Sequence, residues 1–244
     1  MDTQLDTPLL SPHHLEYRPL QPQQPRPAAT AEERLPFTVR LVHNQQDLSK
    51  ALQIRYAAYA RHVPSFAESL KLAEPTDSND GVAILLAESK FDGSPLGTMR
   101  IQTNGFNPLS LEQSVELPDW LQDKSLAEAT RLGVTEQKVG RIVKTVLFKA
   151  YYLYCVQNGI DWMVIAGRSP IDRQYDRLLF SDVYPGMGYI PLRHANNMPH
   201  RVLAFEVGTA EERWNLAKHP LTNFIFHTSH PDINIGSRNP AQLQ

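Results

Sequence analysis

The sequence predicts a mixed α/β fold, in which helices pack on a sheet, and three observations favour this class. Short runs typical of strands recur between longer segments with helical periodicity. Two of these runs, VAILLAE and LGTMRIQ, are separated by FDGSP, a pattern typical of an antiparallel hairpin. A third run, WMVIAG, is apolar throughout, as in a strand that is covered on both faces. A sheet with helices packed on it accommodates all three.

The first half of the ordered chain is predicted to contain a strand, a helix and the hairpin. Apolar and polar residues alternate over 37–41, which indicates a half-buried strand. Asn44 suits the N-cap of a helix that runs to about Arg61, and Asp47 falls in its first turn. A polar connection, residues 62–80, then leads into the hairpin.

The second half is predicted to alternate strands and helices before it ends in a helix. Thr209 and Glu212 have the spacing of a capping box for that last helix, which Pro220 must end or interrupt. The other predicted elements are a strand at 128–134, a helix from about 140 to 157, a strand at 162–167, a helix at about 171–180 and strands near 189–192 and 201–207.

Composition restricts the function classes. The chain has 244 residues, of which 41% are apolar and 20% charged, with a formal net charge of −2. A charge near zero argues against a general nucleic-acid binder. The single cysteine excludes a disulfide framework and suits a cytoplasmic location. No apolar run approaches 18 residues and no signal peptide is evident, so we expect a protein that is not transmembrane.

Composition also predicts the domain organisation. Residues 1–34 contain six of the 19 prolines and few large apolar side chains, which predicts a flexible Pro/Gln-rich tail. Residues 35–208 form the predicted main domain, and residues 209–244 form a predicted C-terminal helical extension.

Several familiar site motifs are missing. The sequence has no GxGxxG, GxxxxGK[ST] or HExxH. His227, His230 and Asp232 lie close together and can in principle bind a metal, but no other ligand motif supports them, so we predict no metal. Cys155 lies among apolar residues of a predicted helix, which favours an inert buried thiol.

Charged and polar side chains occur where apolar ones are expected. Two interpretations remain open for them: structural salt bridges across the sheet, or a cluster that grips a polar substrate. They are Arg55 and Tyr59 on the first helix, Asp77 and Asp80 in the connection, Arg100 in the hairpin, and Glu128 and Arg131 in the strand EATRLGV.

A basic group lies near the start of the helix at 140–157. It consists of Lys138, Arg141 and Lys144. Helix N-termini normally favour acidic side chains, so cations there indicate either an anion to be bound or a solvated basic face.

These motifs, in this order, resemble the GNAT acyltransferase superfamily, and most closely its branch of acyl-homoserine-lactone synthases and N-acyl amino acid synthases. The resemblance covers about residues 37–207. It rests on four motifs: Arg55-x-x-x-Tyr59, Asp77-x-x-Asp80, Gly97-Thr98-x-Arg100 and Glu128-x-x-Arg131-Leu132-x-Val134.

The resemblance implies a GNAT-like mixed, V-shaped sheet flanked by helices, whose fourth strand carries a bulge. It implies transfer of a fatty acyl group from a thioester to the α-amine of an amino acid, without a tightly bound cofactor. The donor is an acyl-phosphopantetheine thioester, on an acyl carrier protein or on coenzyme A. The loop Gln137-Lys138-Val139-Gly140-Arg141 departs from the usual GNAT pattern, which leaves the carrier protein open as the partner.

Roles for the site residues follow from this resemblance. Glu128 is the predicted general base. The predicted substrate-binding residues are Arg55, Tyr59, Asp77, Asp80, Arg100 and Arg131; of these, Arg100 and Arg131 are expected to hold the acceptor carboxylate. The predicted donor-binding residues are Lys138, Gly140, Arg141 and Lys144.

Three alternatives stay open. The chain can be a homoserine-lactone synthase, which acylates S-adenosylmethionine, or an acetyltransferase that uses acetyl-CoA. It can also be a non-catalytic ligand sensor whose charges are structural.

Overall fold

A mixed sheet of nine strands forms the centre of the molecule, in a computed structural model that describes residues 31–236. Its strands run in the order β11-β2-β3-β4-β5-β6-β9-β7, and β8 pairs with β9. The strands are β2 (Phe37–Leu41), β3 (Val82–Ser89), β4 (Pro95–Thr103), β5 (Leu126–Val134), β6 (Trp162–Gly167), β7 (Ser181–Asp182), β8 (Ile190–Leu192), β9 (Met198–Glu206) and β11 (Ile233–Asn234). Within this sheet, only β11–β2 and β5–β6 pair in parallel. The predicted mixed α/β class is confirmed.

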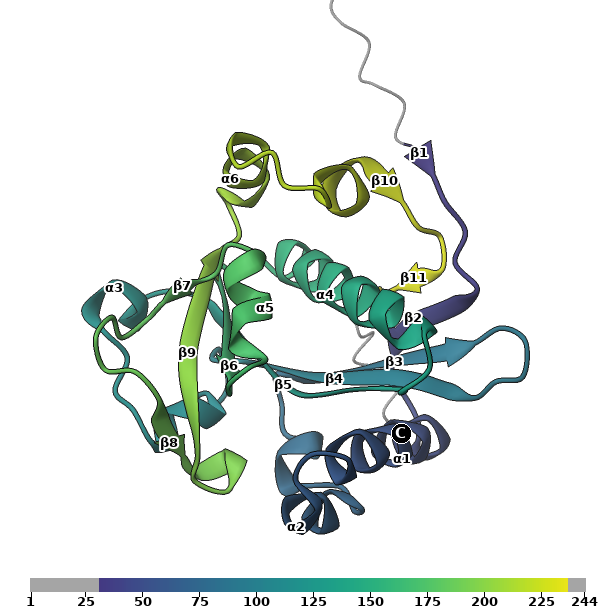
Figure 1. The fold of residues 1–244 in the computed structure, drawn as a ribbon, viewed down its shortest axis with the longest axis horizontal. Helices are drawn as coiled ribbons and strands as arrows, with labels where there is room; N and C mark the ends of the chain where they lie inside the picture. Colours follow the sequence, from purple (N-terminus) through teal and green to yellow (C-terminus); the bar gives the residue numbers. More distant parts are fainter. Residues whose placement is uncertain (1–30, 237–244) are drawn as a thin grey trace, which may run out of the picture.

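Helices cover both faces of the sheet (Figure 1). The long helix α4 (Val139–Gln157) lies on one face, and α1 (Gln45–Ala60) with α2 (Pro64–Ala67) lies on the other. The remaining helices are α3 (Asp119–Gln122), α5 (Asp172–Arg177) and α6 (Ala210–Leu216), the π-helix Asn223–His227, and the 3-10 turns η1 (Glu68–Leu70), η2 (Pro75–Ser78), η3 (Ser110–Gln113) and η4 (Arg193–Ala195). None of the helices in residues 31–236 has the length and apolar composition to cross a membrane.

Burial follows the sequence patterns. Phe37, Val39 and Leu41 turn the same side of β2 into the core under α4. Asn44 caps α1 as predicted, because its side-chain oxygen accepts a hydrogen bond of 2.9 Å from the amide of Asp47. The long helix α4 turns Val143, Val146 and Leu147 into the same core.

The C-terminal extension contains two short strands in addition to its helices. After α6 the chain forms β10 (Thr228–Ser229), which pairs with β1 (Ala31–Glu32), and then β11, which joins the main sheet beside β2. The capping box predicted for α6 is wrong: Thr209 makes no cap, since its hydroxyl bonds the carboxylate of Glu206 at 2.8 Å instead. The predicted tail, 1–34, lies outside the described residues except for its last four.

A buried lysine ties this extension to α4. Lys149 Nζ contacts the carbonyls of Phe224 and Thr228 at 2.6 and 2.5 Å, and His230 Nδ1 at 2.8 Å. Asp232 in turn forms an ion pair of 2.7 Å with Lys90. Within residues 31–236, no group of histidine, cysteine or carboxylate side chains has the arrangement of a metal site.

Candidate active site

A β-bulge in β5 shapes the candidate site. Arg100 and Thr98 of β4 face Thr130 and Gly133 of β5, so one residue of β4 opposes two of β5. Arg131 lies in the bulge and has a positive φ of 55°. Since a non-glycine residue rarely adopts this conformation, the surrounding contacts must hold it there. The bulge breaks the alternation of faces and brings Arg131 to the side of the sheet that carries Glu128 and Thr130.

The sheet opens beyond this bulge. β5 and β6 pair from Leu126 opposite Trp162 to Ala129 opposite Ile165, and both strands then continue without pairing to each other. A cavity of about 570 Å³ lies in the opening. We call it the fork cavity. Residues 129–134 of β5 form one wall and residues 166–168 the other, and the remaining lining includes Tyr59, Phe66, Lys144, Gln174, Tyr175, His194, Met198 and His200.

Three arginines and two carboxylates form a buried network beside the fork cavity. Arg55 holds Asp77 with two hydrogen bonds of 2.8 and 3.1 Å. Arg100 bonds Glu74 at 3.1 Å and Asp77 at 3.2 Å. Arg131 holds Glu74 with two bonds of 2.6 Å. Paired forks of this kind fix both side chains in the geometry that guanidinium and carboxylate groups prefer.

The network keeps its carboxylates ionised. Burial alone raises the pKa of Glu74 and Asp77, but the bonds and charges of the arginines outweigh it and lower both pKa values. With Arg55, Arg100 and Arg131 against two carboxylates, the network carries an excess of one positive charge.

The sequence placed four of these residues together, and the structure adds the fifth. Arg55, Asp77, Arg100 and Arg131 lie within one network, whereas Glu74 was missed. The sequence does carry a signal for Glu74, since it precedes Pro75 and lies three residues before Asp77, the spacing of a capped turn. In the structure it begins a short 3-10 turn, and its amide donates a hydrogen bond to the Asp77 carboxylate.

Two further predicted residues lie apart from the network. Tyr59 lines the fork cavity and packs edge-on against Phe66, whose ring also faces the guanidinium of Arg131 at 5.1 Å. Asp80 is exposed, and its bond of 3.5 Å to Asn107 uses its backbone carbonyl. The structure therefore does not bring the Asp80 side chain to the site, because the loop turns outward after Asp77.

Glu128 lies behind the lining of the fork cavity. It is fully buried and absent from the lining of the fork cavity. Its Oε2 accepts a bond of 3.1 Å from the amide of Leu111, and its Oε1 lies 3.5 Å from Nε2 of His194. Burial raises its pKa to about 7, although the Leu111 amide and two arginines act in the opposite direction. His194 was not predicted, since a histidine in a short turn carries no sequence pattern.

Basic side chains lie at the start of α4, of which one reaches the fork cavity. Lys138 and Arg141 are exposed at the start of α4, and Lys144 lines the cavity and bonds Gln174. Gly140 lets α4 begin close to β5: a Cβ there would lie 2.1 Å from the carbonyl oxygen of Thr135. The four predicted donor-binding residues thus lie at one end of α4, and among them Lys144 alone lines the fork cavity.

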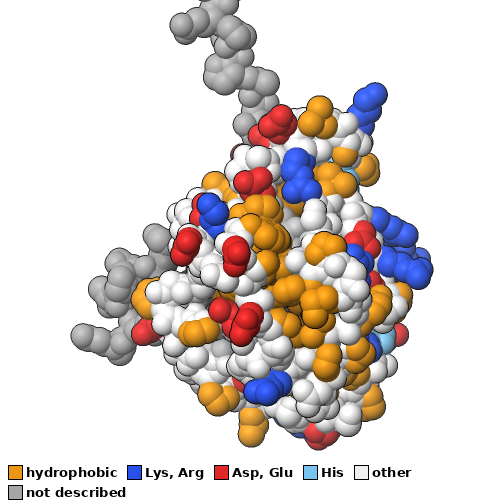
Figure 2. Space-filling view, turned by 90° about the vertical axis from the view of Figure 1, so that its left-hand side faces the viewer, with side chains coloured by type: hydrophobic (Ala, Val, Ile, Leu, Met, Phe, Trp, Pro, Cys, Tyr) orange, Lys and Arg blue, Asp and Glu red, His pale blue; other side chains and the backbone are white. Residues whose placement is uncertain are grey.

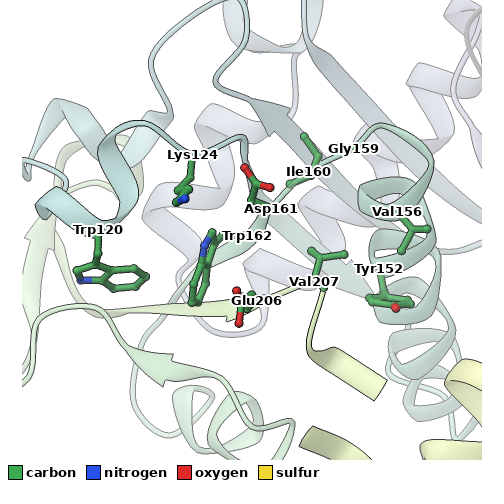
Figure 3. A pocket seen from close by; sticks show the side chains of 11 residues that line it. Trp120, Lys124, Tyr152, Val156, Gly159, Ile160, Asp161, Trp162, Glu206 and Val207 are labelled. Carbon is green, nitrogen blue, oxygen red and sulfur yellow. The ribbon is translucent and has the colours of Figure 1, made fainter. Parts of the chain in front are cut away.

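A second hollow lies elsewhere and has different chemistry. It measures about 580 Å³, and the side chains that line it in Figure 3 include Trp120, Trp162 and Tyr152 together with Lys124 and Glu206. Apolar side chains gather on this side of the molecule, with acidic ones beside them (Figure 2). None of its lining residues has a buried, unpartnered side-chain polar atom. The fork cavity is therefore the better candidate, although the two volumes are alike.

Comparisons with known proteins bear on the fold. No protein-family model and no curated protein sequence matches the chain. Among solved structures, it is similar to FeeM, an N-acyl amino acid synthase from uncultured soil microbes, with a TM-score of 0.59 and 20% identity over 75% of this chain and 96% of that one.

Two acyl-homoserine lactone synthases are similar as well. BjaI, a CoA-dependent acyl-homoserine lactone synthase, matches 84% of this chain and 97% of its own with a TM-score of 0.50 and 13% identity. The acyl-homoserine lactone synthase LasI matches 70% and 90%, with the same TM-score and identity. The predicted fold class, a GNAT-like mixed α/β sheet flanked by helices, is therefore confirmed, and the chain shares this fold with these three solved structures.

Proposed function

We propose that this protein is an N-acyltransferase that moves a fatty acyl group from a thioester to the α-amine of an amino acid. The observation that supports the proposal is the fork cavity, which is lined by Lys144, by the end of β5 that does not pair with β6, and by His194, whose ring contacts the buried carboxylate of Glu128. Amide formation from a thioester is downhill, so no metal or nucleotide is required. The cytoplasmic location predicted from composition is part of this proposal.

The donor would enter beside the start of α4. Lys138 and Arg141 would meet the phosphate of the phosphopantetheine arm, or an acidic carrier protein, and Lys144 lies further in. Beyond Ala129 the backbone of β5 has no partner in β6. The amides of the pantetheine arm can hydrogen-bond there as an added strand would.

The acceptor would bind beside the bulge. Arg131 lines the cavity, and Arg100 stands behind it at 1% exposure. Both already hold carboxylates, but the network has one positive charge in excess, which favours one further carboxylate near Arg131. Backbone N–H groups of β5 would stabilise the oxyanion of the tetrahedral intermediate.

Glu128 would take the proton that the ammonium group of the acceptor must lose before attack. Its raised pKa of about 7 suits this role, because the carboxylate is a stronger base than an exposed glutamate and still ionised near neutral pH.

Product analysis tests the function. The purified protein is incubated with a long-chain acyl carrier protein or acyl-CoA and a mixture of amino acids, and the products are identified by mass spectrometry. We expect long-chain N-acyl amino acids. Lactones formed from S-adenosylmethionine would show the synthase alternative, transfer of acetyl groups only would show an acetyltransferase, and no product from any donor would favour the sensor.

A further inference from the structure

The fork cavity is lined by basic side chains. Its basic residues are Arg61, Arg131, Lys144 and Arg168, together with His62, His194 and His200. Among the described residues that line it, none is an aspartate or a glutamate. Because a positively charged surface without carboxylates attracts negative charge, the cavity is suited to an anionic ligand.

Three of its four arginine and lysine side chains already have partners within the protein. Arg61 donates to two main-chain carbonyls at 3.2 and 2.7 Å. Arg131 holds a carboxylate of the buried network, and Lys144 bonds the amide side chain of a residue on α5. The guanidinium of Arg168 forms no hydrogen bond or ion pair with any other residue in 31–236. Arg168 is therefore the cation of this lining whose donors are free for a ligand.

The strand pairing places Arg168 beside His200. The ladder between β6 and β9 ends with Gly167 opposite Arg201. The next residue of each strand brings Arg168 opposite His200, and side chains at facing positions share one face of a sheet. Burial lowers the pKa of His200 and the charge of Arg168 lowers it further, which agrees with this proximity. The main chain of Arg168 is held in place, because its carbonyl accepts a bond of 3.0 Å from the amide of Asp172.

This pair lies on the face of the sheet opposite to α4. Val164 of β6 packs with Val202 of β9 in a cluster separate from the one that contains the core of α4. Since alternate residues of a strand share a face, Arg168 continues the row of Val164. Leu126, two residues before Glu128, belongs to the same cluster. Arg168 and Glu128 therefore lie on one side of the sheet, and α4 with its basic residues lies on the other.

His200 leaves the charge of Arg168 uncompensated. Its Nδ1 lies 2.8 Å from the carbonyl oxygen of Met198, which can only accept a hydrogen bond, so Nδ1 carries the proton. Burial lowers the pKa of the ring, and Arg168 and Arg131 add to this effect, so the ring is neutral at pH 7. A neutral imidazole neither neutralises the guanidinium nor competes with it for an anion.

We propose that Arg168 binds the carboxylate of the acceptor and thereby selects amino acids over uncharged amines. The identity of the acceptor rests on the proposed function. A guanidinium matches a carboxylate through two parallel N–H donors, and Arg168 has both available. Arg131 adds positive charge nearby, whereas its own donors are occupied by Glu74 and by the carbonyl of His194.

The position of Arg168 favours the carboxylate of the acceptor over a phosphate of the donor. The residues proposed to meet that phosphate lie at the start of α4, on the other face of the sheet. The two faces meet where β5 and β6 stop pairing. An amino acid held by Arg168 keeps its amine on the side of Glu128, and the thioester reaches it from the side of α4 through this opening.

Arg168→Met tests the site, because methionine is also a long side chain but has no charge and no donor. We expect the KM for the amino acid to rise by about 10²-fold, the scale of a lost charge-assisted pair. The KM for the amide of the same amino acid, the KM for the donor and kcat should each change by less than about threefold. Arg168→Lys keeps the charge without the fork and should give an intermediate KM.

Arg173→Met is the matched control. Arg173 is exposed on α5, close to Arg168 in sequence, and lies outside the cavity lining, so its replacement should leave all of these constants unchanged. Equal losses for the amino acid and its amide in Arg168→Met, or a KM for the amino acid that stays at the wild-type value, would overturn the assignment.

A binding measurement separates this proposal from the proposed function. The probes are the N-dodecanoyl derivatives of glycine, leucine and phenylalanine, and isothermal titration calorimetry compares each acid with its amide. We expect the wild type and Arg173→Met to bind at least one acid about 10²-fold more tightly than its amide, and Arg168→Met to bind the two alike.

This preference needs no turnover, so it supports the carboxylate site even if the wild type forms no acyl product, the result that defeats the proposed function. Arg168→Lys takes the place of Arg168→Met if the latter fails to fold, and it should lose most of the preference. A wild type that binds no acid more tightly than its amide, or a preference that persists without Arg168, would show that the carboxylate is held elsewhere or not at all.

Discussion

The substitution Glu128→Gln should separate a buried base from a structural salt-bridge partner by opposite effects on stability. The pKa of Glu128 rises from an ordinary value of 4.5 to about 7 in the folded protein, mainly because the group is buried. A carboxyl group with a raised folded-state pKa is harder to ionise in the folded than in the unfolded chain. Folding stability therefore falls as the pH rises from about 4.5, and the loss is complete above about pH 7.

The magnitude follows from the size of the shift. A change from 4.5 to about 7 corresponds to about 3 kcal/mol at pH 8, of which about 1 kcal/mol is already lost at pH 5. Glutamine carries no charge, and its oxygen can still accept the bond from the amide of Leu111. The free energy of unfolding of Glu128→Gln, relative to the wild type, should therefore rise by about 2 kcal/mol between pH 5 and pH 8.

Urea unfolding at the two pH values measures this difference, and steady-state kinetics on the same samples measure the loss of turnover. We expect a more stable and about 10²-fold slower protein at pH 8. A variant that is less stable at pH 8 and keeps its rate would refute the reasoning, because that is the behaviour of a carboxylate whose main partner is an arginine.

Three other changes test the rest of the site. Charge reversal at Lys138 and Arg141 should strongly raise the KM for an acyl carrier protein. Added salt should raise the same KM of the wild type, because exposed charges are screened within about 10 Å at 0.1 M salt. A KM that neither change affects would show that Lys138 and Arg141 are only part of a solvated surface. If Arg131 helps to hold the acceptor carboxylate, an amino acid should react much faster than its amide, and equal rates would remove that role. Arg55→Met should lower the free energy of unfolding by about 3–5 kcal/mol in urea, because Asp77 loses both bonds of its closest partner in a buried site; a loss below about 1 kcal/mol would show that Arg100 alone compensates.

Local patterns in the sequence were sufficient for most of the fold. The hairpin, the helix capped by Asn44 and the apolar strand at 162–167 each depend on residues that are neighbours in the chain. The two-residue strands β1, β7, β10 and β11 could not be predicted, because they exist through pairing with distant segments. The capping box of α6 failed for a related reason, since Glu206 competes for the hydroxyl of Thr209.

The sequence by itself determined which charges would be expensive to bury: Arg55, Arg100, Glu128 and Arg131 interrupt apolar patterns and so had to find partners. Only the tertiary structure determined which residues those partners are. Glu74 and His194 lie in turns without periodicity, and they reach the site because the bulge at Arg131 turns its guanidinium and the η4 turn toward each other. Side-chain contacts across 57 and 63 residues are set by the packing of the sheet, and no local pattern encodes them.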